Sequence, residues 1–339
     1  MACQSPTYAR TVVRVVSLNC LASTLADKKC FVNSPESALE PAFRLGRLRD
    51  FVRGQCLEGC VICLQEVDPA TYGELVPVLD EHHYTAVYVP YGTNHFHMGC
   101  LTAYSNVKYG TRQVDPTRIS SEVVGPRSSA VDRSTPGWWS LAGSLANVIG
   151  WVIRAGTEAP AQPDPDYLRA VQKQNVMHSI CLFERKSGES FWVANYHMPC
   201  DFTRPVVMEY HSRAVAQVLQ SLVRKIEAPV IFAVDMNSTR DSGAYNVICD
   251  EWSPVYDCER ELGSNEPTCK SQSIISGVAK QFVGVIDYVF VTRHFEVLQP
   301  SWPSAVQPQL DDCGPSEQWI SDHRPIFVEL ELYDNKIVH

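Results

Sequence analysis

The sequence contains no run of about 18 apolar residues, the length that a membrane-spanning helix requires. The segment from Met1 to Arg10 also lacks a basic region followed by an apolar stretch, the pattern of a secretory signal. These absences argue against a membrane or secreted protein and predict a cytoplasmic or nuclear one. With 45% hydrophobic and 20% charged residues, the 339-residue chain has the composition of a globular protein with a substantial core.

An excess of positive charge is also missing. The 38 acidic residues outnumber the 29 basic residues and give a formal net charge of −9. Non-specific binding to nucleic acid scales with the number of phosphates neutralised, so this balance argues against a broad basic surface that coats nucleic acid. It does not exclude a nuclease, because a site that binds divalent cations with carboxylates is itself acidic and a short basic groove can still guide one strand.

The sequence shows no disulfide framework, because its 13 cysteines are odd in number and scattered through apolar segments. Cys60 and Cys63 form one C-x-x-C, but no second pair completes a tetrahedral metal site. On a strand, residues three apart point to opposite faces. We therefore expect reduced thiols packed in the core.

The apolar pattern predicts two strand-helix-strand units. In the first unit, a β-branched strand over 11–19 precedes a helix over 37–55 and a buried strand over 60–67. The second unit and the chain end contain these expected elements: strands near 176–183 and 191–197, a helix over about 206–226, and strands over 229–235, 283–291 and 324–332. Residues 110–168 show no sustained period. We expect them to form an irregular insertion in a single domain that spans 1–339.

Isolated carboxylates, amides and histidines recur beside the ends of these strands. They are Asn19, Glu66, His197, Asp235 with Asn237, Asp287, and Asp322 with His323. Taken singly, a glutamate after a strand or a Ser-Asp-His sequence is more often a solvated turn or a helix cap. Their recurrence in one chain favours a shared site, because burying such groups without partners would be costly.

Phosphodiester hydrolysis accounts for this combination of side chains. The reaction needs a cation that neutralises developing charge, a deprotonated water in line with the leaving group, and donors to the phosphate oxygens. Mg²⁺ prefers oxygen ligands and keeps several waters. We expect Glu66 to be its central ligand, with Asn19 and Asp322 as direct or water-mediated neighbours and Mn²⁺ as the alternative ion.

The other residues of the set are expected to act on the phosphate and the attacking water. His323 would contact the scissile phosphate, and Asp287 would accept a hydrogen bond from its other ring nitrogen. Asp235 and Asn237 are two apart, so they share one side of an extended backbone. Asp235 would orient or deprotonate the water, Asn237 would donate to the phosphate, and His197 would be a second donor.

Several segments resemble the endonuclease/exonuclease/phosphatase superfamily, and within it the nocturnin, Angel and carbon-catabolite-repression deadenylases. The similar segments are SLNCLAS (17–23), LEPAFRLGRLRDFV (39–52), CLQEVDPATY (63–72), QNVMHSICLFE (174–184), VDMNSTRDSGAY (234–245) and PTCKSQSIISGVAKQFVGVIDYVFV (267–291). Together they cover most of the chain outside 110–168. The superfamily motifs that they resemble include L-Q-E-V, G-D-x-N and the D-Y-I-F block.

The resemblance implies a fold and supports the site described above. The implied fold is a four-layer α/β/β/α sandwich of two mostly antiparallel sheets, with a magnesium site at one edge. It also implies that Glu66 binds Mg²⁺, that Asp287 partners His323, and that Asp235, Asn237, His197 and His323 surround the phosphate. Asn175 matches an asparagine beside the substrate phosphate or ribose, so it joins Asn237 and His197 as a candidate substrate-binding residue.

The resemblance implies an RNA-shortening enzyme, but departures from the motifs leave its substrate open. Val234 replaces the glycine of G-D-x-N, and the segments 97–105 and 197–205 differ from the stretches that border the leaving nucleotide in the family. We expect the substrate to be RNA or a nucleotide, and we expect the enzyme to remove mononucleotides from the 3′ end of RNA. The alternatives are DNA ends or adducts, a small phosphorylated molecule, and a catalytically silent nucleic-acid-binding protein.

Overall fold

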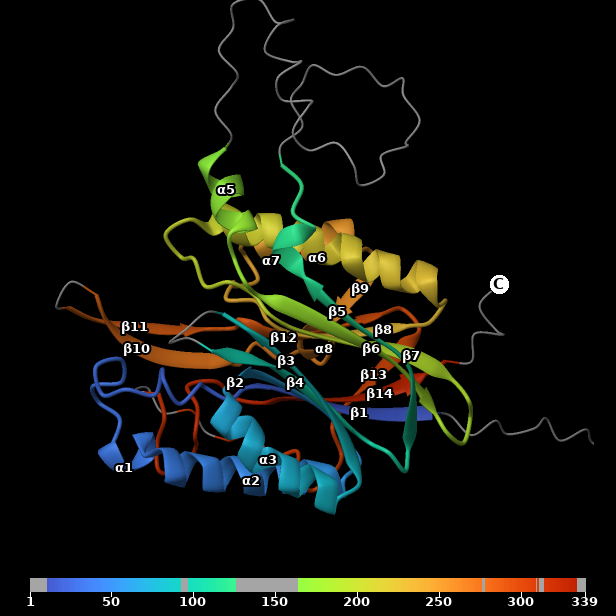
Figure 1. The fold of residues 1–339 in the computed structure, drawn as a ribbon, viewed down its shortest axis with the longest axis horizontal. Coiled ribbons are helices and arrows are strands. Elements are labelled where there is room, and N and C mark those ends of the chain that lie inside the picture. Colours follow the sequence, from blue (N-terminus) through green and yellow to red (C-terminus); the bar gives the residue numbers. More distant parts are fainter. Residues whose placement is uncertain are drawn as a thin grey trace, which may run out of the picture.

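The computed structural model describes residues 11–92, 97–125, 164–275, 278–308, 310 and 314–333. Two six-stranded sheets pack face to face, and helices cover the outer face of each sheet (Figure 1). The architecture is therefore the expected four-layer α/β/β/α sandwich. Among the described residues, no helix is long and apolar enough to cross a membrane.

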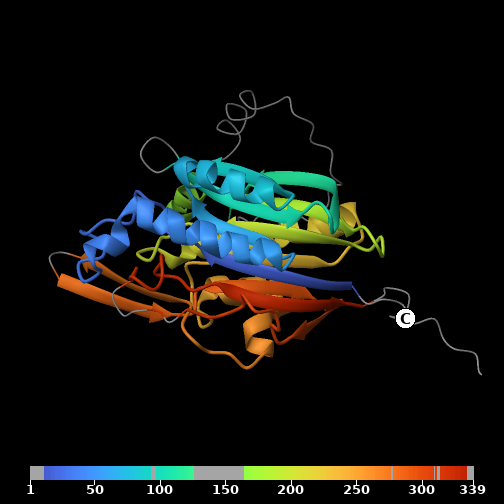
Figure 2. The same ribbon diagram turned by 90° about the horizontal axis from the view of Figure 1, so that it is seen from below.

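The first sheet has the strand order β13-β14-β1-β2-β4-β3. Its strands are β1 (Thr11–Asn19), β2 (Val61–Val67), β3 (Tyr84–Tyr91), β4 (Met98–Ser105), β13 (Phe295–Leu298) and β14 (Ile326–Leu332). All neighbours are antiparallel except β1 and β2. Figure 2 shows α2 (Pro41–Leu57) and α3 (Pro69–Glu81) side by side, and the short α1 (Glu36–Leu39) precedes them.

The second sheet has the strand order β5-β6-β7-β8-β12-β9. Its strands are β5 (Tyr109–Arg118), β6 (Val176–Glu184), β7 (Ser190–His197), β8 (Val230–Asp235), β9 (Val255–Asp257) and β12 (Asp287–Thr292). Only β7 and β8 are parallel. The accompanying helices are η2 (Ile119–Ser121), α5 (Pro165–Val171), α6 (Pro205–Lys225), α7 (Gly243–Glu251) and α8 (Cys258–Glu261).

Three apolar layers hold the sandwich together. The layer between the sheets includes Val15, Val61, Phe191 and Val289, all fully buried. The outer layers lie between each sheet and its helices. Because the central strands are covered on both faces, they are continuous apolar runs rather than alternating ones. Every residue of β8 is buried, for example.

The two parallel strand pairs determine where the site forms. In each pair the strands are joined by a helical crossover, α2 between β1 and β2 and α6 between β7 and β8. Parallel strands end at the same edge of a sheet, so each crossover brings two distant polar residues together. The two-stranded sheet of β10 (Cys269–Ile275) and β11 (Val278–Gly284) projects beyond the sandwich (Figure 1).

The structure corrects two of the expected elements. The predicted strand over 283–291 is divided, because β11 ends at Gly284 and β12 begins at Asp287. The backbone amides of Ile286 and Asp287 both donate to Thr268 Oγ1 at this break, at 2.9 and 3.1 Å. Part of the expected irregular insertion, residues 110–118, belongs to the edge strand β5. Residues 126–163 lie outside the described residues.

The described cysteines agree with the expectation of reduced core thiols. All of them are free, and Cys60 and Cys63 are completely buried in and beside β2. Burial raises the pKa of both thiols to about 12. They therefore pack as small apolar side chains, as free buried cysteines generally do.

Candidate active site

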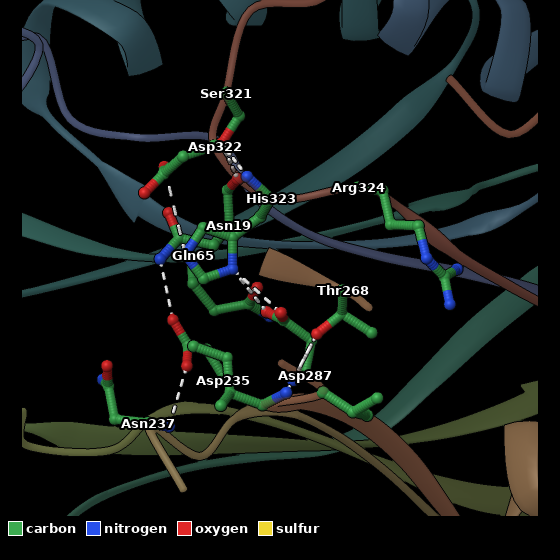
Figure 3. A network of polar contacts seen from close by, with 12 residues as sticks. Asn19, Gln65, Asp235, Asn237, Thr268, Asp287, Ser321, Asp322, His323 and Arg324 are labelled. Atoms are coloured by element: carbon green, nitrogen blue, oxygen red, sulfur yellow. Dashed lines mark hydrogen bonds and ion pairs between the residues drawn. The ribbon is translucent and has the colours of Figure 1, made fainter. Parts of the chain in front are cut away.

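The predicted site residues lie at the edge of the sandwich where both parallel strand pairs end. Figure 3 shows six of them close together: Asn19, Asp235, Asn237, Asp287, Asp322 and His323. Asn19 and Glu66 come from the first sheet, and His197 and Asp235 end neighbouring strands of the second. Asp287 begins β12 directly opposite Asp235. Residues far apart in the chain are thus brought together by the topology of the two sheets.

Unusual backbone conformations direct two of the site side chains. Glu66 and Asn237 have positive φ angles of 56° and 47°, in the left-handed region that non-glycine residues seldom adopt. At Glu66 the register of β2 against β4 shifts between Leu64 and Val67, which marks an irregularity of the β-bulge kind. Such conformations cluster at functional sites, where the surrounding structure must hold them in place.

Asn19 holds two carboxylates side by side. Its Nδ2 donates to Glu66 Oε1 at 2.9 Å and to Asp235 Oδ2 at 2.8 Å. The backbone amide of Ala22 donates to the other Glu66 oxygen at 2.9 Å, and the Leu21 amide donates to Asn19 Oδ1. In this arrangement the Asn19 oxygen faces the backbone, so its predicted role as a metal ligand would require the amide to rotate.

Asp322 supplies a buried oxygen that lacks a hydrogen bond. Among the described residues, nothing donates to its Oδ1, although Asp322 is only 7% exposed. Burial raises the pKa of Asp322 to about 6, the nearby His323 opposes this effect, and Glu66 adds to it. A buried carboxylate oxygen without a donor suits a divalent cation such as Mg²⁺, which prefers oxygen ligands. The residues present therefore fit a divalent metal ion.

His323 is oriented by Asp287. Its Nδ1 lies 2.8 Å from Asp287 Oδ2 and 3.1 Å from Oδ1, as Figure 3 shows. Burial opposes protonation of the imidazole, but Asp287, Cys269 and Asp322 together raise the pKa of His323 well above its ordinary value. Nε2 is left facing Asp322 Oδ1 at 4.0 Å. Asp287 thus has the predicted geometry of a partner that fixes the ring.

His197 lies on the opposite side of the carboxylates. Its Nε2 is 3.1 Å from Asn237 Nδ2, 3.5 Å from Asp235 Oδ2 and 3.8 Å from Glu66 Oε1. Its Nδ1 contacts the hydroxyl of Tyr91 at 2.5 Å. Asn237 also donates to Met198 O at 2.9 Å, so the amide nitrogen faces the ring as a donor. A neutral His197 in this network carries its proton on Nδ1.

Asn175 is beside the site through the backbone of His197. Its Nδ2 donates to the His197 carbonyl at 2.8 Å. The side chain is half-buried just before β6, and its own carbonyl accepts from the Ile119 amide. This contact fixes the end of β7, and the substrate-binding role of Asn175 stays a prediction.

Sequence reasoning missed several residues that support the site. Tyr91 contacts His197, and Thr268 Oγ1 accepts from the backbone amide of Asp287. Ser321 Oγ donates to Asn19 O at 2.8 Å. Arg44, buried in α2, donates to the carbonyls of Cys20, Leu21 and Ile320. An arginine in an otherwise apolar helix stripe and a serine beside Asp322 were the available signals. For Tyr91 no local pattern existed.

Comparisons by sequence find no match: no family model matches the chain, and neither does any curated protein. Comparisons by structure find many. ANGEL2, a 2′,3′-cyclic phosphatase in complex with adenosine-2′,3′-vanadate, superimposes with a TM-score of 0.66 at 16% identity, over 95% of this chain and 96% of that one. The human Nocturnin catalytic domain with bound sulfate has a TM-score of 0.61 at 15% identity, over 95% and 97%.

A third similar structure is D. rerio TDP2 complexed with a single-strand DNA product, with a TM-score of 0.55 at 15% identity over 94% of this chain and 99% of that one. The agreement therefore extends over nearly the whole chain in all three cases. At identities this low, the structural superposition establishes the architecture alone. The chain accordingly has the fold of solved structures described as endonuclease/exonuclease/phosphatase proteins, and it also resembles ANGEL2 and nocturnin in architecture.

Proposed function

We propose that this protein is a magnesium-dependent phosphodiesterase that hydrolyses RNA from its 3′ end. One observation carries the proposal: Glu66, Asp235 and Asp322 lie at one sheet edge between two histidines, His197 and His323. Carboxylates provide cation ligands and a base, and histidines provide donors to phosphate. A purely structural network would satisfy its buried oxygens, whereas Asp322 Oδ1 has no donor among the described residues.

The expected ion would be held by Glu66 and Asp322. When bound, Mg²⁺ supplies Lewis-acid stabilisation of the charge that develops on the phosphate. Asn19 keeps Glu66 in position through its amide nitrogen. The remaining steps belong to the side chains on either side of these carboxylates.

Asp235 is the proposed base for the attacking water. Its Oδ1 accepts from the backbone amide of Asn237 at 2.9 Å, and its Oδ2 accepts from Asn19, so the carboxylate cannot turn away. Each oxygen keeps a lone pair that can accept a hydrogen bond from water. As the water oxygen bonds to phosphorus, its proton passes to Asp235 and the bond to the leaving oxygen breaks.

Three donors surround the place where the phosphate would lie. Although burial opposes it, Asp287 raises the pKa of His323, which favours an Nε2–H that can be donated to the phosphate. Asn237 Nδ2 and His197 lie across the carboxylates from it and now contact each other; to donate to the phosphate, the Asn237 amide would turn from His197, and His197 would carry a proton on Nε2. Positioned donors of this kind stabilise the transition state more than the ground state, because negative charge on the phosphate oxygens increases during attack.

RNA is the favoured substrate because the motif resemblance points to the deadenylases and because ANGEL2 and nocturnin have this architecture. A second candidate is a terminal phosphatase activity, favoured by the similarity to ANGEL2, whose structure holds adenosine-2′,3′-vanadate. DNA ends are a third substrate class, since TDP2 has the same fold with a DNA product bound.

A substrate panel tests the proposal. Purified protein with Mg²⁺, Mn²⁺ or EDTA would be incubated with labelled poly(A), mixed-sequence RNA, RNA ending in a 2′,3′-cyclic phosphate, nicked DNA and nucleotide phosphates. We expect Mg²⁺-dependent release of mononucleotides from RNA. Loss of the cyclic phosphate alone would assign the second candidate. Absence of any metal-dependent product would overturn the enzyme assignment and favour a silent binding protein.

A further inference from the structure

Cys269 lies against two of the site residues and forms a second group of metal-ligand atoms with them. The ligand atoms of Cys269, Asp322 and His323 all lie within 4.8 Å of one another. The three residues are almost entirely buried, at 2%, 7% and 6% exposure. A thiol, a carboxylate and an imidazole are ligand types that Zn²⁺ combines in proteins.

The backbone holds these three residues together. Cys269, the first residue of β10, forms an isolated antiparallel bridge with His323. The amide of Lys270 donates to the carbonyl of Asp322 at 2.8 Å. The amide of Arg324 donates to the carbonyl of Thr268, also at 2.8 Å. The segment 268–270 is thereby fixed beside 322–324, so the ligands do not depend on a mobile loop.

The orientation of His323 is that of a zinc-ligating histidine. Asp287 occupies Nδ1, which leaves Nε2 facing Asp322 Oδ1 at 4.0 Å. Metal-binding histidines almost always give their other nitrogen to a carboxylate or carbonyl in this way. Asp322 Oδ1 is a buried oxygen with no hydrogen-bond donor among the described residues, which is independent support for a cation at this atom.

We propose that Cys269, Asp322 and His323 bind a Zn²⁺ ion that inhibits the enzyme. Three protein ligands would leave the fourth tetrahedral position to water. In a tetrahedral zinc site the ligand atoms are about 3.5 Å apart, as follows from bond lengths of about 2.0 to 2.3 Å, so atoms that now lie within 4.8 Å of one another would need to approach by at most about 1.3 Å. On binding, the Cys269 thiol and Nε2 of His323 each lose their proton to solvent, and no oxidation or reduction is involved.

The chemistry of the two neighbouring sites separates their metals. Glu66 offers oxygen only, which suits Mg²⁺, whereas the sulfur of Cys269 selects zinc and similar softer ions. Asp322 is common to the two ligand sets. A zinc ion there would also occupy Nε2 of His323, the atom proposed to face the phosphate, so occupancy by zinc and catalysis exclude each other.

Metal binding is tested without relying on activity. The full chain, stripped with a chelator, would be titrated with Co²⁺ as a spectroscopic substitute for zinc. We expect a sulfur-to-cobalt charge-transfer band and tetrahedral visible bands, displaced by one equivalent of Zn²⁺. Cys269→Ser should abolish the charge-transfer band. Cys258→Ser, at another fully buried thiol, is the matched control and should keep it. A band that is absent, or that survives in Cys269→Ser, overturns the site.

The inhibitory effect rests on the proposed function and has its own readout. In excess Mg²⁺, Zn²⁺ should inhibit the wild type and Cys258→Ser alike, and Cys269→Ser should need at least about tenfold more zinc. Circular dichroism and Tm of each variant establish that it is folded. Equal inhibition of Cys269→Ser overturns the inhibitory role. A cobalt band without activity on any substrate would instead overturn the proposed function and leave the metal site standing.

Discussion

Asp287 and Asp235 lie directly opposite each other in the antiparallel pair of β12 and β8, both almost completely buried. Like charges in such positions repel. The repulsion is balanced differently on the two sides: Asp287 contacts the ring of His323, whereas Asp235 accepts from the Asn19 amide and the Asn237 backbone. One carboxylate is thus committed to a histidine, and the other remains available to water.

Asp287→Asn should leave the fold intact and reduce turnover. An amide in this place no longer stabilises a protonated His323 and does not fix which ring nitrogen carries the proton. We expect kcat to fall by about 10²- to 10⁴-fold with a small change in KM, by analogy with other carboxylate–histidine pairs. The pH profile of kcat tests the reason for the loss. The apparent pKa assigned to protonated His323 should move down, toward that of ordinary histidine. An unchanged profile would contradict the assignment.

Glu66→Gln tests the proposed metal ligand. The amide keeps the size of the side chain, so the fold should survive. It lacks the negative charge with which the Glu66 carboxylate would bind the ion. We expect activity to fall by orders of magnitude and to recover partly at high Mg²⁺, because the lost interaction is with the cation. Asp50→Ala, an exposed carboxylate on α2, is the control and should behave as wild type. Full activity of Glu66→Gln at low Mg²⁺ would remove Glu66 from the site.

Arg44 joins the two segments that carry Asn19 and Asp322. Its guanidinium donates to the carbonyls of Cys20 and Leu21 on one side and to Ile320 O, at 2.9 Å, on the other. Burial lowers the pKa of Arg44, and the nearby Cys20 and Asp322 oppose that effect. A lysine cannot reproduce this fork of donors, because its ammonium is a single point charge.

Arg44→Lys should therefore raise the Mg²⁺ concentration needed for half-maximal activity by about tenfold, with a smaller effect on kcat at saturating Mg²⁺. Arg47→Lys is the matched control, because Arg47 also donates to a backbone carbonyl, Glu317 O, but from an exposed position on the same helix. A loss of stability in Arg44→Lys without a change in Mg²⁺ dependence would show that the residue supports the fold alone.

The parts of the fold that were predicted from sequence are those whose environment is uniform. β1 and β8 were located within one residue because β-branched and apolar residues dominate both strands, and all of β8 and most of β1 is buried. β5 was missed because it is an edge strand, with Pro116 and several exposed polar residues that obscure the alternation. Local patterns describe central strands better than edges.

For the site, sequence order supplied the residues but not their hydrogen bonds. The predicted partnership of Asp287 with His323 has the expected geometry, because both lie at a strand boundary that the motif marked. The positive φ of Glu66 and the contact of Tyr91 with His197 are consequences of packing between β2, β3 and β7. No spacing in the chain encodes them, nor does it encode the hydrogen bonds from the Asn19 amide nitrogen to Glu66 and Asp235.

His178, fully buried between the sheets, should make the protein sensitive to acid. Burial lowers the pKa of His178 to about 3, while the unfolded chain has the ordinary value of 6.5. Below pH 6.5 the unfolded state binds a proton that the folded state does not. Stability is therefore fully present above pH 6.5 and is lost as the pH falls toward 3, at up to about 1.4 kcal/mol per pH unit.

Urea unfolding of the wild type and His178→Gln between pH 7 and pH 4 would measure this contribution, since glutamine can still donate to Thr102 Oγ1, which lies 2.7 Å from Nε2 in the wild type. The variant should be somewhat less stable at pH 7, but its stability should fall less steeply with acid. Subtracting the two curves cancels the carboxylates that titrate in both proteins. His211, whose pKa burial lowers to about 4, should give a second, smaller difference of the same sign in His211→Gln. Parallel curves for wild type and His178→Gln would mean that the imidazole gains its proton without unfolding, through water reaching the space between the sheets.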